Sequence, residues 1–353
     1  MRSELIRYAR SRDGVKIAWT MAGEGPATLV IAAGNITDIR RDWENPLRRD
    51  LLNALSRRFR VLRYDHRGCG LSQRDVARQG LEAWVDDLES VCDAAGLRSP
   101  FVLFAASQAG PHAITFAARN PRRVSHLALL GVCRCGPRAS GDPVAKAQVE
   151  AMLELVRVGW GRTFPGARRL VTSFLVLDPT EEESRWDEDQ LPLAATAEDA
   201  WRFFDADADA DARPWVSEVR VPTLVVHAAE DSCIPPAIGR LVAGSIPGAT
   251  YLEIPGRNHI PLARDPGFEA LIEAILEFTD ASSTAPAGLT AREVQILQGL
   301  VAGLSNEAIA LRHGVSPKTV RNQLIRIFDK LQVNSRTQAA LKASAWLRPH
   351  EDA

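Results

Sequence analysis

The chain has 353 residues, of which 46% are hydrophobic and 25% are charged, and its 43 lysines and arginines nearly balance its 44 aspartates and glutamates. This length exceeds what one hydrophobic core usually serves, so we expect one large and one small domain. No apolar run approaches the roughly 20 residues of a membrane helix, and the charged first residues are unlike a signal peptide. We therefore expect a cytoplasmic protein without membrane contact.

Five cysteines form an odd count without paired CxxC spacing, which argues against a disulfide framework and against a zinc site. Cys133 and Cys135 flank one residue, and small side chains at a strand end explain them more simply than a redox pair. The alternating acids of residues 205–212 lack the glycine and distal glutamate of a calcium loop, so we expect a solvated turn or helix end there. We predict neither a metal nor a cofactor.

Apolar stretches alternate with helical ones as far as residue 279. Residues 6–12 and 15–22 surround Asp13-Gly14 and predict an antiparallel edge hairpin. Strands covered on both faces should read as continuous apolar runs. Six such runs occur, at 27–34, 59–65, 101–107, 126–132, 221–228 and 250–256. This pattern predicts an α/β domain whose mostly parallel, doubly wound sheet is covered by helices.

Ser107 follows the run "FVLF" and precedes a plausible helix with Pro111 in its first turn. A sharp strand-to-helix turn of this kind exposes the serine hydroxyl and points the helix N-terminus at it. A serine becomes a nucleophile only when a base takes its proton and an acid orients that base. The sequence therefore has to supply an acid and a histidine after later strands.

Asp231 and His259 follow the last two apolar runs in that order. They are our candidates for the acid and the base that serve Ser107. For four of the remaining histidines we expect packing or surface positions, namely His66, His112, His126 and His227. Both a hydrolytic triad and a hydrogen-bonded pocket floor that binds a ligand without turnover are consistent with these residues.

With this triad order, residues 1–279 resemble the α/β-hydrolase fold family. The stretch "YDHRGCGLS" (64–72) is similar to that family's turn after the fourth strand, and "AAGN" (32–35) is similar to its oxyanion loop. The resemblance implies an oxyanion hole made by the backbone N–H groups of Asn35 and Gln108. Ala105 and Ala109 stand where the family usually has glycine, which narrows the backbone options around the serine.

Residues 134–218 separate two sheet runs and are helical in pattern, so we expect a helical cap over the strand ends. The cap is rich in aromatic residues. These favour an apolar or aromatic acyl group in the pocket, although packing within the cap explains them equally well. The aromatic residues concerned are Trp160, Phe164, Phe174, Trp186, Trp201, Phe203 and Phe204.

Residues 280–288, "DASSTAPAG", hold no large apolar side chain and predict a linker. The region that follows, 289–348, carries nine lysines and arginines against three acids. Such a basic region on a mildly acidic chain indicates contact with a polyanion. Thr290 with Glu293 predicts a capping box, Ser305 a second helix start, and Ser316-Pro317 a third.

Two short helices joined by a glycine-containing turn predict a helix-turn-helix unit. On the third helix Val320, Leu324 and Ile327 must face inward, which leaves a polar face outside. Cations on such a face bind phosphates, and an amide can read a base edge. The residues that we assign to DNA contact are Lys318, Thr319, Arg321, Asn322 and Arg326. A solvated amphipathic helix is the plainer alternative from periodicity alone.

The region 289–343 closely resembles the LuxR-type helix-turn-helix domain, through "LTAREVQIL", "GLSNEAIA", "VSPKTVRNQL" and "IFDKLQVNSRTQAA". The resemblance implies a fourth helix over 336–346 that supplies a dimer contact, and dimers that read paired half-sites. Gln323 stands where many members have histidine, which bears on base preference.

Together these features predict a ligand-responsive LuxR-type transcriptional regulator with DNA, a small-molecule ligand and a second copy of itself as partners. Its α/β-hydrolase domain would sense, and in one version hydrolyse, a small ester or lactone. The alternative is a serine hydrolase, an esterase or lactonase, with an accessory DNA-binding tail. A purely structural partner-binding module is disfavoured by both sets of motifs.

Overall fold

The structure is a computed structural model that describes residues 4–161, 166–231, 233–279, 289, 291–301, 303–313 and 315–344. The chain divides into two compact units, Met1–Thr279 and Asp280–Ala353. The predicted linker 280–288 lies outside the described residues, and so do Phe164, Thr290 and Trp346. Among the described residues no helix is long and apolar enough to cross a membrane.

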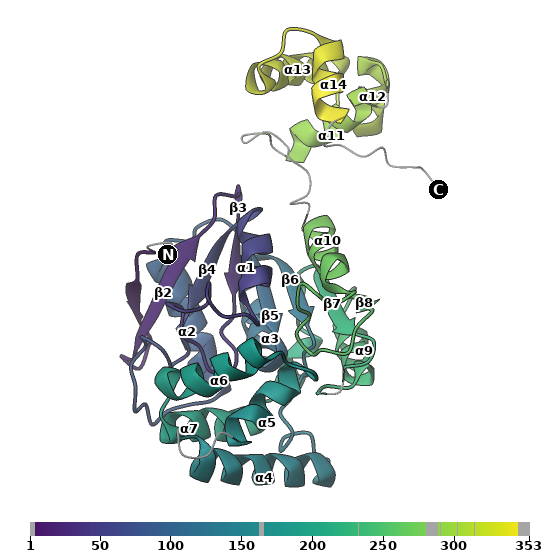
Figure 1. Ribbon diagram of the computed structural model, residues 1–353. Helices are drawn as coiled ribbons and strands as arrows, with labels where there is room; N and C mark the ends of the chain where they lie inside the picture. Colours follow the sequence, from purple (N-terminus) through teal and green to yellow (C-terminus); the bar gives the residue numbers. More distant parts are fainter. Residues whose placement is uncertain are drawn as a thin grey trace. The chain divides into compact units, whose positions relative to one another are not determined.

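An eight-stranded sheet forms the centre of the first unit, in the order β1-β2-β4-β3-β5-β6-β7-β8 (Figure 1). The strands β1 and β2 form the antiparallel edge hairpin, β2 also pairs antiparallel with β4, and every later pairing is parallel. The predicted mostly parallel sheet is thus confirmed. The strands are β1 (Arg7–Arg10), β2 (Lys16–Ala22), β3 (Ala27–Ile31), β4 (Phe59–Tyr64), β5 (Phe101–Ala106), β6 (Val124–Leu130), β7 (Thr223–Ala228) and β8 (Thr250–Ile254).

Burial along the strands explains this order. Every residue of β7 is buried, as is all of β5 except its last residue, whereas three of the four residues of β1 are exposed. Continuous apolar runs such as β5 and β7 can lie only between two helix layers, while the polar β1 belongs at an edge. The strands that carry the candidate serine and acid are therefore the best-buried parts of the sheet.

Helices pack on the sheet in two groups. α1 (Arg49–Ser56) contacts α10 (Phe268–Phe278), while α3 (Gly110–Arg119) contacts both α2 (Leu81–Ala94) and α8 (Arg213–Val216). α9 (Pro236–Ser245) packs on β7 and β8. This arrangement covers the central strands on both faces, as a parallel sheet requires.

Four of the described helices between β6 and β7 gather at one end of the sheet (Figure 1). They are α4 (Pro143–Gly159), α5 (Gly166–Leu175), α6 (Glu181–Ala194) and α7 (Ala197–Ala208). Trp160, Phe203 and Phe204 are almost fully buried in a hydrophobic cluster that α4 and α7 share. These cap aromatics therefore pack within the cap.

The described part of the second unit consists of four helices: α11 (Ala291–Val301), α12 (Asn306–His313), α13 (Pro317–Leu331) and α14 (Arg336–Ser344). The Ser316 side chain accepts the backbone N–H of Thr319 at the start of α13, and Ser305 accepts that of Ala308 in α12. Both predicted N-caps are confirmed. Lys330 of α13 forms a 2.7 Å ion pair with Glu293 of α11, which fixes one end of α13 against its neighbour.

Candidate active site and DNA-binding helix

Ser107 occupies a strained turn between β5 and α3. It opens a single 3₁₀ turn, Ser107–Ala109, and its backbone φ is +53°. A non-glycine residue in this left-handed region costs roughly 1–2 kcal/mol, so the surrounding fold must impose the conformation. The turn presents the serine to a cavity instead of to the core, since Ser107 is one of that cavity's lining residues.

Close packing holds this turn in place. A Cβ added to Gly110 would approach Val132 Cβ to 2.7 Å and the carbonyl oxygen of Cys133 to 2.9 Å. A Cβ added to Gly34 would lie 3.0 Å from the Cβ of Ala109. The methyl group of Ala109 therefore fits because Gly34, on the facing loop, has no side chain. The alanine that replaces the usual family glycine is accommodated by its neighbour.

Asp231 and His259 form a buried pair beyond the ends of β7 and β8. His259 Nδ1 lies 2.7 Å from Asp231 Oδ2, and both side chains are fully shielded from solvent. Because a carboxylate only accepts hydrogen bonds, Nδ1 must carry the proton, which leaves Nε2 as an acceptor. Nε2 is buried and has no hydrogen-bond partner among the described residues. The geometry therefore leaves free the nitrogen that a general base uses.

Asp231 is held as a carboxylate by four donors. Its Oδ1 accepts the backbone N–H groups of Cys233 at 2.9 Å and Ile234 at 3.0 Å, and a second histidine, His227, places Nε2 3.2 Å from Oδ2. Burial favours a raised pKa for Asp231, but the hydrogen bonds from His227 and His259 outweigh it and lower that pKa. The acid is thus ionised at neutral pH.

His227 also belongs to the site, although the sequence predicted only a packing or surface position for it. Its Nε2 also donates to the carbonyl oxygen of Ile234 at 2.7 Å, so one N–H serves both that carbonyl and Asp231. A Cβ on Gly239 would lie 2.3 Å from His227 Nδ1, which shows how tightly the ring is seated. In the sequence, its position four residues before Asp231 was the one feature that indicated a contact with that acid.

The other histidines near the site are buried packing residues, as predicted for them. His66 stacks edge-on against Trp84 and Phe203, with ring centroids 5.0 and 4.7 Å apart. His112 lies edge-on to the same Trp84. Burial lowers the pKa of His66 to about 3 and that of His112 to about 4, so both rings are neutral at physiological pH.

Asn35 and Gln108 are the two residues that the sequence predicts for the oxyanion hole. Asn35 has a φ of +60°, and its own side-chain oxygen accepts the backbone N–H of Ile36 at 2.7 Å. Asn35 lines the same cavity as Ser107. Gln108 follows the serine directly, and its side chain donates to Asp207 of α7 at 3.0 Å. Asn35 is therefore held by a contact within its own turn, and Gln108 by a contact with the cap.

Asp207 was predicted to be part of a solvated turn or helix end. The predicted helix end is confirmed, because α7 ends at Ala208. The Asp207 side chain, however, is half-buried instead of fully exposed to solvent. Burial raises the pKa of Asp207 to about 7, against the lowering effect of the Gln108 hydrogen bond. Alternating acids and alanines do not reveal which carboxylate turns inward. Among the described residues no group of His, Cys, Asp or Glu is arranged to hold a metal.

The cavity beside Ser107 has a volume of about 130 Å³. Its walls are mostly aliphatic, with Leu47, Val176 and Ile260 among them, and its polar floor includes Arg48 and Arg63. Arg63 is neutralised by Asp42 and Glu4, each 2.5 Å away. Of the cap aromatics described, none lines this cavity, so the aromatic acyl interpretation gains no support from it.

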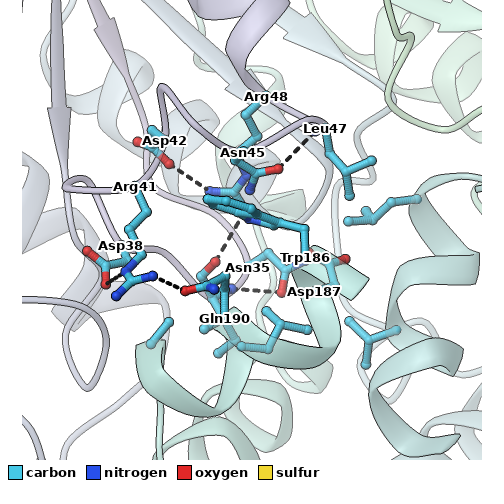
Figure 2. Close-up of a pocket in the computed structure, with 15 residues that line it drawn as sticks. Asn35, Asp38, Arg41, Asp42, Asn45, Leu47, Arg48, Trp186, Asp187 and Gln190 are labelled. Atoms are coloured by element: carbon cyan, nitrogen blue, oxygen red, sulfur yellow. Dashed lines mark hydrogen bonds and ion pairs between the residues drawn. The ribbon is translucent and has the colours of Figure 1, made fainter. Parts of the chain in front are cut away.

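A smaller polar recess of about 40 Å³ adjoins this cavity and shares Asn35, Asp42 and Arg48 with it. Figure 2 shows Arg41 extending from the loop after β3 toward Gln190 of α6, to which it donates a hydrogen bond. Trp186 and Asp187 also come from α6. The cap therefore supplies one wall of the recess.

α13 presents the predicted polar face to solvent. Lys318, Arg321, Asn322 and Arg326 are exposed, while the opposite face is buried. Thr319 is half-buried, and its hydroxyl lies 2.8 Å from that of Ser316, so its contact with DNA stays a prediction. Its side chain thus belongs to the N-cap. The described geometry suits phosphate contacts by the cations and base contacts by Asn322.

Comparisons with known proteins assign a family to each of the two units. Residues 28–266 match the family described as alpha/beta hydrolase fold, and residues 287–343 match the luxR family of bacterial regulatory proteins. The chain is 28% identical over 254 residues to 2-hydroxy-6-oxononadienedioate/2-hydroxy-6-oxononatrienedioate hydrolase 2 of Pseudomonas putida, covering 67% of this chain and 84% of that protein.

Over 51 residues the chain is 47% identical to the transcriptional regulatory protein YdfI of Bacillus subtilis, covering 14% of this chain and 24% of that one. The esterase from Exiguobacterium antarcticum superposes with a TM-score of 0.67 at 19% identity, covering 78% of this chain and 100% of that chain. That likeness concerns the fold alone. The chain belongs to the alpha/beta hydrolase fold family and carries, in the same polypeptide, a LuxR-type DNA-binding domain.

Proposed function

We propose that the protein is a cytoplasmic transcriptional regulator that binds a small ester or lactone in its hydrolase domain and changes its DNA occupancy in response. The observation that carries this proposal is the joining of a capped cavity at Ser107 to a helix-turn-helix with an exposed basic face. A regulator needs one site for the signal and one for the operator. This chain has a candidate for each.

The cavity supports a small carbonyl compound as the ligand. An engineered cavity of about 150 Å³ holds benzene, so about 130 Å³ admits a short acyl group. Ser107 lies at its wall, and the backbone N–H groups assigned to Asn35 and Gln108 would bind a carbonyl oxygen. An ester or lactone places its carbonyl between these groups. Aliphatic walls then take the hydrocarbon part, and the recess takes a polar substituent.

Site roles follow from this proposal. Ser107 is the nucleophile or the ligand's hydrogen-bond partner, His259 the base, and Asp231 the acid that orients it. Lys318, Arg321 and Arg326 bind DNA phosphates, and Asn322 reads a base edge. We propose a dimer that reads paired half-sites, for which α14 is one candidate contact.

A second candidate function is catalysis by the hydrolase domain, with the DNA-binding domain as an accessory. It is favoured by the φ of +53° at Ser107 together with the free Nε2 of His259, which are the preparations that a nucleophilic serine needs. The two functions are compatible if the regulator slowly destroys its own signal.

The test of the proposed function is selection of duplexes from a random DNA library by the full chain, followed by titration of a selected duplex at several salt concentrations. We expect log Kd to rise with log salt, as phosphate neutralisation requires. Lys318→Ala and Arg326→Ala should each weaken binding, whereas Lys16→Ala, which removes an exposed cation from the edge strand β2, should not. Failure to select any duplex would end the regulator proposal.

Labelling with a small fluorophosphonate, read by intact mass, separates receptor from enzyme. Modification that disappears in Ser107→Ala would show an activated serine, and turnover of ester and lactone panels would then decide whether the second candidate holds. An unmodified protein with intact fold would remove the enzymatic version and leave the binding version. The DNA titration is independent of this result.

A further inference from the structure

The outer face of cap helix α4 carries an apolar stripe that nothing in the proposed function uses. Val144, Leu155 and Val158 expose 62%, 37% and 67% of their surface, and Ala147 and Ala151 are exposed between them. The opposite face of α4 is buried through Val149, Leu153 and Val156. Figure 1 shows α4 at the outer edge of the cap. An exposed apolar stripe of this extent usually marks an interaction surface.

The spacing of the stripe identifies a helix as its partner. The five residues are separated by steps of three, four, four and three positions. This averages 3.5 residues, the repeat that keeps an apolar seam facing a second helix over two turns or more. A core-facing stripe would follow the same rule, but the core-facing side of α4 is already occupied by other residues. The seam therefore lacks a partner within the described unit.

The symmetry of the stripe identifies that partner as a second copy of α4. Val144 and Val158 each lie seven residues from Ala151, and Ala147 and Leu155 each lie four residues from it. If two copies pack antiparallel about a two-fold axis at Ala151, Val144 meets Val158 and Ala147 meets Leu155. The largest side chain then faces one of the smallest, as close packing requires. A two-fold interface must be self-complementary in just this way.

The charges beside the seam do not oppose this contact. Glu154 pairs with Arg157 of the same helix at 2.8 Å, and Glu150 pairs with Arg138 at 2.9 Å. These acids are therefore neutralised within one protomer, so their approach across the axis costs little. From the antiparallel register we infer that α4 is a homodimer interface, formed by residues 144–158 of two chains.

The size of the seam sets the expected strength of the dimer. Residues 144–158 span about 21 Å of helix, and a single pair of such helices buries less than the roughly 800 Å² per partner of a standard interface. We therefore expect a reversible dimer, whose formation depends on protein concentration. Two half-sites on one DNA would strengthen it, because the second binding event becomes intramolecular.

The interface is tested by oxidative crosslinking of the full chain, with the wild type as the background for its native cysteines. Ala151→Cys places two thiols at the axis, and we expect a disulfide-linked dimer. Val144→Cys alone and Val158→Cys alone should not link, because each thiol is about 21 Å from its own mate along the helix. An equal mixture of the two variants should link. Linking of Val144→Cys to itself would contradict the antiparallel register.

A second measurement does not depend on engineered thiols. Sedimentation equilibrium of the full chain should show Leu155→Glu to dimerise at least tenfold more weakly than the wild type, since it places a charge in the seam. The matched control is Leu241→Glu on α9, whose side chain is similarly exposed at 45% and which should leave the equilibrium unchanged. A wild-type monomer at all concentrations, or a dimer unaffected by Leu155→Glu, would overturn the inference.

Discussion

Replacing Asp231 with asparagine should separate orientation of the base from the rest of the site. The amide keeps the size of the side chain, and its oxygen can still accept the N–H groups of Cys233 and Ile234. Its NH₂ group would then face His259 Nδ1, where two donors cannot meet. His259 must therefore move its proton to Nε2, which removes the acceptor for Ser107. A wrong tautomer of this kind lowers triad reactivity by about 10⁴-fold.

The same substitution should cost stability, because Asp231 is 4% exposed and loses charge-assisted hydrogen bonds from His227 and His259. We expect the free energy of unfolding of the variant to be about 2–4 kcal/mol lower than that of the wild type at pH 7. The folded pKa of Asp231 lies below its ordinary 3.8, so the wild type gains this stability above pH 4 and loses it as pH falls through the folded pKa. The difference between variant and wild type should therefore shrink in acid.

Two assays check these numbers: the rate of fluorophosphonate labelling by intact mass, and urea denaturation between pH 3 and 8. Asp209→Asn is the matched control, because this carboxylate lies at the cap surface with its side chain 58% exposed and, among the described residues, pairs with Arg138 alone. It should behave like the wild type in both assays. Labelling of Asp231→Asn within threefold of the wild-type rate would refute the assigned role of the Asp231–His259 pair.

Three further predictions concern the elbow, the cap and the DNA-binding helix. Gly110→Ala should lower the free energy of unfolding by about 1–3 kcal/mol in urea denaturation and should slow labelling, because the new Cβ meets Val132 at 2.7 Å. Its control is Gly244→Ala, at a helical glycine with open space around it, which should not destabilise the protein. Asp207→Asn should be more stable than the wild type above about pH 7 but equal to it below pH 4. Burial raises the pKa of the wild-type carboxyl to about 7, so the wild-type protein loses stability as rising pH forces this group to ionise. Thermal melts across this pH range check the sign. Lys318→Ala and Arg326→Ala should each reduce the slope of log Kd against log salt by about one, measured by fluorescence anisotropy, and an unchanged slope would exclude a phosphate contact.

Local sequence patterns were enough to place most elements. The apolar runs that became β5 and β7 are nearly continuous because both faces are covered, and the serine caps of α12 and α13 lie where their side chains and following residues indicate. Such features depend on residues close together in the chain. The pairing of Asp231 with His259 was also predictable, because both residues follow parallel strands whose carboxyl ends lie at one edge of the sheet.

The partners of individual side chains could not be predicted from the sequence. Asp207 meets Gln108 across 99 residues, and His227 joins Asp231 only because the turn after β7 folds back on the strand. The hydroxyl of Thr319, which we assign to DNA contact, also lies 2.8 Å from that of Ser316, and the sequence did not predict this contact. In each case rotamer and packing decide among several partners that the sequence allows, and periodicity carries no information on that choice.

The most direct test of a regulator that senses through its hydrolase domain is the DNA affinity of the full chain before and after a fluorophosphonate fills the Ser107 cavity. Ser107→Ala treated in the same way controls for modification elsewhere. The proposal predicts at least a fivefold change in Kd for the labelled wild type and none for the control, which corresponds to a coupling of about 1 kcal/mol. Identical salt-dependent binding of labelled and unlabelled protein would contradict it.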